Sequence, residues 1–153
     1  MPLRLLECMQ AEMITQGVGR KPATAGSTLP PVWLAPRQGA VGPGQERDPY
    51  MHPTMVVSLY AGGGFPTAPF EGFWDAGRIV DVRIRSLDAA AADDLALELH
   101  QIFGDRQNWD MGGLHVEETQ RYMPLQLIST DRDLGWDFLI RFMFWCRMAS
   151  YLA

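Results

Sequence analysis

Three segments of the chain alternate residue by residue between two faces, which is the period of a β-strand. They are Thr54–Tyr60, Arg78–Arg85 and Asp137–Arg147. In the second segment the apolar face consists of Val80, Val82 and Ile84, and the opposite face consists of Ile79, Asp81, Arg83 and Arg85. A fourth strand is expected over Leu114–Met123, ending before Pro124.

Two other segments carry apolar residues at the three- and four-residue spacing of an amphipathic helix. The first runs from Pro2 to about Gln16, and Gly17 is expected to end it, because the left-handed C-cap position favours glycine. The second is Leu87–Phe103, which Gly104 is expected to stop. Its apolar arc consists of Ala91, Ala92, Leu95, Leu99, Ile102 and Phe103. Leu97 falls on the polar arc, which is unusual for a free monomer.

The connecting segments are rich in glycine and proline. Gly17–Pro53 has one short apolar run, Val32-Trp33-Leu34, and the segment is expected to be an extended arm that orders against a neighbouring subunit. Gly62-Gly63-Gly64 is expected to form a loop at a strand end. A hairpin turn is predicted at Asp131-Arg132-Asp133-Leu134-Gly135, where aspartates cap backbone N–H groups and the glycine takes a positive φ.

The last strand is apolar on both faces. One face consists of Phe138, Ile140, Phe142, Phe144, Cys146 and Met148, and the other consists of Leu139, Arg141, Met143, Trp145 and Arg147. A sheet with one solvated face should show a clean apolar–polar alternation. The two predicted helices are needed on one face, so the sequence predicts that Leu139, Met143 and Trp145 are partly buried between subunits.

Length and charge narrow the class of protein. The 153 residues, 47% of them hydrophobic, are expected to form a single domain, 1–153, with an arm at about 17–53 and a sheet-and-helix core at about 54–148. The net charge is −5, and Lys21 is the only lysine. An acidic chain without a basic stripe is a poor candidate for wrapping nucleic acid. The strand arginines Arg78, Arg83, Arg85, Arg141 and Arg147 are instead expected to pair with carboxylates at a protein interface.

No segment predicts a catalytic, cofactor or metal site. A calcium loop beginning at Asp131 would need a glutamate at its twelfth position, which is Phe142. A phosphate-binding loop needs a helix directly after its glycines, and Pro66 follows the triplet instead. His115 and Glu117 share a strand face, but two donors do not make a metal site. A dispersed catalytic triad is left open by the sequence.

The two cysteines, Cys8 and Cys146, are expected to be buried reduced thiols, with a disulfide only if the first helix packs on the last strand. No transmembrane helix and no signal peptide are expected. Trp33, Trp74 and Trp109 are predicted to lie in loops. A tryptophan in a loop is typical of an interface anchor, although it can equally fold back on its own core.

Taken in order, these elements resemble the tail terminator family of tailed bacteriophages, whose members are also known as minor capsid or tail completion proteins. The resemblance rests on the strand that leads into Gly62-Gly63, the arginine-ended strand Val80–Arg85, the alanine-rich helix with Leu95 and Leu99, and the hairpin with an aromatic closing strand. It covers Thr54–Met148 well and the first half weakly. It implies an α+β fold with a small, mostly antiparallel sheet of four to five strands and two helices on one face.

The resemblance further implies a virion protein without enzymatic activity or cofactor, assembled in the host cytoplasm into a ring, commonly a hexamer. Such a ring stops polymerisation of the tail tube below it, docks the head connector above it, and lets DNA pass without specific binding. Six copies would carry a charge of about −30, and the lumen is predicted to be net acidic. The candidate interface residues are Trp33, Gly62, Gly63, Gly64, Trp74, Arg83, Arg85, Leu97, Trp109, Leu139, Arg141, Met143 and Trp145. Another neck or head-closure protein, a small enzyme and a nucleic-acid binder remain as alternatives.

Overall fold

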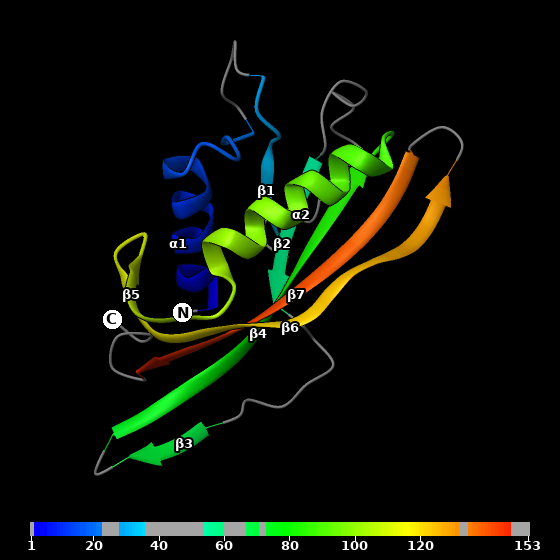
Figure 1. Cartoon of the computed structure of the whole chain (residues 1–153). Coiled ribbons are helices and arrows are strands. Elements are labelled where there is room, and N and C mark those ends of the chain that lie inside the picture. The colour runs from blue at the N-terminus through cyan, green and yellow to red at the C-terminus, as the bar shows by residue number, and fades with distance from the viewer. Residues whose placement is uncertain are drawn as a thin grey trace.

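The computed structural model describes residues 2–22, 28–35, 54–59, 67–70, 73–131 and 135–147. These residues form two helices and seven strands, which Figure 1 shows as a single curved sheet with both helices on the same side. The helices are α1 (Pro2–Thr15) and α2 (Ala89–Phe103). The strands are β1 (Val32–Ala35), β2 (Thr54–Leu59), β3 (Thr67–Phe70), β4 (Phe73–Ser86), β5 (Arg106–Met111), β6 (Leu114–Asp131) and β7 (Gly135–Arg147).

The sheet has the strand order β1-β2-β4-β7-β6-β5, and β3 pairs with the first part of β4. Only β1 and β2 run parallel, and all other described pairs are antiparallel. The predicted α+β class with two helices is therefore confirmed. The predicted count of four to five strands is wrong, because β3 and β5 were not foreseen. Pro69 in β3 and the polar run Arg106-Gln107-Asn108 in β5 weaken the sequence signals of these strands.

Both helices bury their apolar sides against one face of the sheet. α2 packs on β4, β6 and β7, and α1 packs on β1, β2 and β5. The alternation predicted from the sequence is confirmed on this face, where the fully buried strand residues include Met55, Val57, Val80, Val82, Ile84, Phe142 and Phe144. Phe103 at the end of α2 is fully buried and lies 5.7 Å from Phe142 and 6.0 Å from Phe144 between ring centroids. One continuous core therefore joins both helices to the sheet.

The helix ends follow the predicted signals. Gly17 has φ +75°, and the N–H of Val18 donates to the carbonyl of Met13 at 3.0 Å, which closes α1. α2 begins two residues later than expected, because the Asp88 side chain caps it by accepting from the Ala90 N–H at 2.9 Å. At the other end the Gly104 N–H donates to the His100 carbonyl at 2.7 Å.

Two glycines shape the tight turn between β5 and β6. Gly112 and Gly113 have φ values of 55° and 90°, as a two-residue hairpin of this kind requires. A Cβ atom at Gly112 would collide with the backbone carbonyl of Cys8, so the turn lies directly against α1. Cys8 and Cys146 are both buried, as predicted.

The first part of the predicted arm packs against its own chain. Arg20 is 7% exposed, and its guanidinium donates to the carbonyls of Leu29 (Nε, 2.9 Å) and Pro22 (Nη1, 2.8 Å). Val18 and Val32 on either side are buried in the core. The expectation of an arm held only by a neighbour is therefore wrong for residues 17–22 and 28–35, and residues 36–53 lie outside the described ranges.

Candidate interaction surface

The sheet face opposite the two helices, here called the helix-free face, carries most of the residues singled out in the sequence. Residues paired directly across strands share a face, so the register defines its rows. Thr54, Arg85 and Asp137 form one row, and Val56, Arg83 and Leu139 form the next. The following rows are Ser58, Asp81 and Arg141, then Ile79 and Met143, and finally the position of Trp145.

One end of this face holds an ion-pair network. Arg85 binds Asp137 through two hydrogen bonds, from Nε to Oδ1 at 3.0 Å and from Nη2 to Oδ2 at 2.9 Å. Arg83 adds a third bond, from Nη2 to Oδ2 at 3.3 Å. Two guanidinium groups thus share one carboxylate at this end of the face.

A second ion pair lies in the middle of the face. The Nε of Arg141 donates to Oδ1 of Asp81 at 2.6 Å, and both side chains are mostly buried. The prediction that Arg83, Arg85 and Arg141 pair with carboxylates is therefore right, but their partners belong to the same chain. Cross-strand neighbours in β4 and β7 supply these partners, a register that the sequence alone does not reveal.

Replacing Asp137 by alanine is expected to lower the free energy of unfolding by about 2 kcal/mol, because the change removes a nearly buried carboxylate that accepts three charged hydrogen bonds. Chemical denaturation followed by circular dichroism measures this change. Asp110→Ala is the matched control, because Asp110 is 81% exposed and should change stability by less than about 0.5 kcal/mol. Equal stability losses in the two variants would show that the network does not hold β4 to β7.

Beyond the ion pairs, the helix-free face mixes apolar side chains with polar residues of β6, because Gln126, Gln120 and Glu118 pair with Leu139, Met143 and Trp145. Leu139, Met143 and Trp145 are all partly exposed, whereas their neighbours along β7 on the other face are buried. Neither described helix covers these three side chains. Their placement opposite the helices agrees with the sequence, and their burial between subunits stays a prediction.

On the opposite side of the molecule, α2 presents an acidic outer surface with one leucine. Leu97 is 57% exposed, as its position on the polar arc predicted. Asp93 and Asp94 lie four and three residues before it and are exposed, so both carboxylates flank the leucine on the helix surface. We call Asp93, Asp94 and Leu97 the α2 surface. α2 contains no lysine or arginine that would neutralise it.

A further apolar cluster, not foreseen from the sequence, lies at the end of the β6–β7 hairpin. Its exposed members are Leu87, Leu127, Ile128 and Trp136. Trp136 pairs with Ser86 across the strands and stacks on Phe138, with ring centroids 6.4 Å apart and an angle of 11° between the planes. The available signal was the pair of apolar residues Leu127-Ile128 close before the predicted turn and Trp136 directly after it. We call these four residues the hairpin cluster.

The predicted interface tryptophans lie in strands, which corrects their expected placement in loops. Trp33 lies in β1 and is 7% exposed, and its indole N–H has no partner among the described residues. Trp109 lies in β5, is 7% exposed and donates to Thr119 Oγ1 at 3.0 Å. The backbone of Trp74 belongs to β4 and pairs with Pro69. Gly62, Gly63 and Gly64 lie outside the described residues. Trp33 and Trp109 therefore pack within the protomer.

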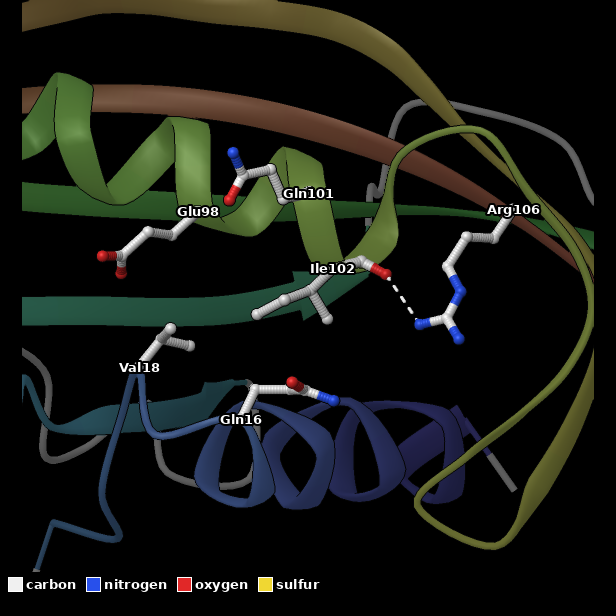
Figure 2. A pocket seen from close by; sticks show the side chains of 6 residues that line it. All are labelled: Gln16, Val18, Glu98, Gln101, Ile102 and Arg106. Atoms are coloured by element: carbon white, nitrogen blue, oxygen red, sulfur yellow. Dashed lines mark hydrogen bonds between the residues drawn. The ribbon is translucent and has the colours of Figure 1, made fainter.

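One cleft opens between the C-terminal ends of α1 and α2, and Figure 2 shows its lining. Its volume is about 350 Å³, and it is lined by Gln16, Val18, Glu98, Gln101, Ile102 and Arg106. Arg106 is held in place because Nη1 donates to the Ile102 carbonyl at 3.2 Å and the guanidinium lies 3.9 Å from the centroid of the Trp109 ring. The ionisable residues of the described lining are Glu98 and Arg106.

The described ranges hold neither a metal-ligand cluster nor a helix suited to crossing a membrane. These residues contain no group of three or more histidine, cysteine, aspartate or glutamate side chains placed to hold a metal ion. His115 lies next to Asp110, with Nδ1 3.4 Å from Oδ1. Neither α1 nor α2 has the length and apolar character that crossing a bilayer demands, within the part of the chain that is described.

No protein-family model matches the sequence, and no curated protein matches it. Among solved structures, one chain with no stated function is 15% identical, covering 92% of this chain and 94% of its own length, with a TM-score of 0.42. A similarity at that score carries no argument about fold or function.

Proposed function

We propose that the chain is a structural virion protein of the tail-terminator type, which assembles as a ring on the end of a tail tube. The ring would comprise about six copies, as in the family that the sequence resembles. It would stop growth of the tube protein below, bind a head connector above, and leave a channel through which DNA passes.

The observation that carries this proposal is the set of partly exposed apolar side chains on the helix-free face. Leu139, Met143 and Trp145 lie along β7, with Arg141 between the first two, on a sheet face that neither described helix covers. Full burial of an exposed apolar side chain contributes about 1.5–3 kcal/mol, and because these three are already partly buried, a neighbouring subunit that covers them gains part of that free energy at each position.

The position of the other exposed apolar residues supports a ring over a two-fold dimer. A ring requires two different surfaces on each subunit, because each copy contacts its two neighbours in different ways. The described chain offers the helix-free face on one side of the sheet, and Leu97 and the hairpin cluster elsewhere. These surfaces differ in residue composition and charge, which favours head-to-tail contacts.

Negative-stain electron microscopy of the concentrated protein tests the proposal. We expect closed rings with a central channel, and a map of such rings should place net acidic residues along the lumen. Open fibres, compact two-fold dimers or isolated monomers would each contradict the ring. A channel lined by arginines would contradict the acidic lumen.

A further inference from the structure

We infer that the α2 surface of one copy docks on the arginine-bearing end of the helix-free face of the next copy. This inference rests on the proposed ring and specifies which two surfaces meet at each of its contacts. Each surface has a feature that complements the other: α2 presents carboxylates beside a leucine, and the sheet presents a guanidinium beside a leucine.

The α2 surface carries an exposed apolar side chain next to two carboxylates that no lysine or arginine of the helix neutralises. Leu97 is 57% exposed, and no ion pair holds Asp93 or Asp94 among the described residues. α2 contains no lysine or arginine, and its one basic residue, His100, lies in its last turn. A docking partner for this surface should therefore offer an apolar patch beside a guanidinium or ammonium group.

The helix-free face offers this combination at one end. Arg83 and Leu139 are direct cross-strand neighbours, so a guanidinium lies beside an apolar side chain. The Arg83 side chain is 50% exposed, and its bond to Asp137 is the longest of the three in the network, at 3.3 Å. A guanidinium has five N–H donors, so Arg83 can bind a carboxylate of a second copy while it keeps Asp137.

The two surfaces cannot meet within one molecule. α2 packs on the face of the sheet that buries Val82 and Ile84, and Arg83 points from the opposite face. Contact between them therefore joins different copies, and each copy uses each surface once. That is the arrangement of a head-to-tail ring. Leu97 would then lie against Leu139, with Asp93 and Asp94 directed at the shared Arg83 and Arg85 pair.

Charge reversal with rescue tests this pairing by sedimentation velocity over a concentration series. We expect the double variant Asp93→Arg, Asp94→Arg and the single variant Arg83→Glu each to weaken self-association at least tenfold. All three changes in one chain should restore it to within about threefold of the wild type, because the attraction is re-formed with its sign exchanged. Asp110→Arg and Arg121→Glu reverse exposed charges outside both surfaces and should leave association unchanged.

Leu97→Ser keeps the test decisive if Arg83→Glu disturbs the ion-pair network. Leu97 is exposed, so this variant should retain the wild-type circular dichroism and melting temperature while association falls at least threefold. A wild-type ring that tolerates the reversals and Leu97→Ser overturns the pairing and leaves the proposed ring standing. Disruption without rescue also overturns it. A wild-type protein that stays monomeric overturns the proposed function itself, and the pairing with it.

Discussion

Replacing Phe103 by alanine is expected to lower the free energy of unfolding by about 4 kcal/mol, the typical cost of deleting a fully buried aromatic side chain. Phe103 has no exposed surface and lies within 6.1 Å of Trp109, Phe142 and Phe144 between ring centroids. It therefore joins α2 to β5 and β7 at once. A domain of this size has only about 5–15 kcal/mol of stability, so the variant should lose a large fraction of it.

Leu97→Ala in the same helix is the matched control for Phe103→Ala. Leu97 is 57% exposed, so we expect a change in unfolding free energy below about 0.5 kcal/mol. Urea denaturation monitored by circular dichroism measures both variants at a concentration low enough to keep the protein unassembled. Comparable losses at the two positions would contradict the assignment of one side of α2 to the core and the other to the surface.

Gly112→Ala is expected to cost roughly 2–5 kcal/mol, which combines backbone strain with a steric collision. Gly112 has φ +55°, a region that costs residues with a Cβ atom about 1–2 kcal/mol, and the added methyl group would collide with the Cys8 carbonyl of α1. The change should therefore disturb the packing of α1 on the β5–β6 turn as well as the turn itself.

The neighbouring Gly113→Ala separates these two causes. Gly113 has φ +90°, but no heavy atom lies within 4 Å of a Cβ built there, so only the backbone strain of about 1–2 kcal/mol remains. Thermal melts of both variants give the comparison. If Gly113→Ala proves as destabilising as Gly112→Ala, the close approach of the turn to α1 is not the dominant cost.

The faces of the central elements could be predicted from the sequence because side-chain period determines them. The alternation in β4 and β7 correctly placed Val82 and Phe142 in the core and Arg83 and Met143 opposite. The helical arc of α2 likewise separated Leu99 from Leu97. In these segments burial and local periodicity agree, so a single sequence carries the information.

The second half of β6 could not be predicted from the sequence, because its extent depends on its position in the sheet. The Leu114–Met123 strand was expected to stop before Pro124, yet β6 continues to Asp131. β5 pairs only with the first part of β6, so Pro124 lies where β6 has no second described partner, and a proline is tolerated at such an edge. Three register irregularities in this part of β6 break the alternation further. Edge position is a tertiary property that the local sequence does not encode.

The sequence does contain a signal for β5, which lies at the turn that follows the strand. Gly112-Gly113 separates two apolar pairs, Trp109 with Met111 and Leu114 with Val116, which is typical of a two-residue hairpin.

For the candidate surface, too, some features could be predicted from the sequence and others could not. The sequence indicated which arginines and apolar residues share a face, whereas their partners, such as Asp137 for Arg85, depend on strand register.

Sedimentation equilibrium of the wild type beside the double variant Met143→Glu, Trp145→Glu tests most directly whether another copy covers the helix-free face. We expect the wild type to be several-fold heavier than its 17.2 kDa monomer. We expect the variant to have the monomer mass and an unchanged circular dichroism spectrum, with Ala11→Glu on the exposed side of α1 as the control that still assembles. Equal masses for wild type and double variant would contradict the account.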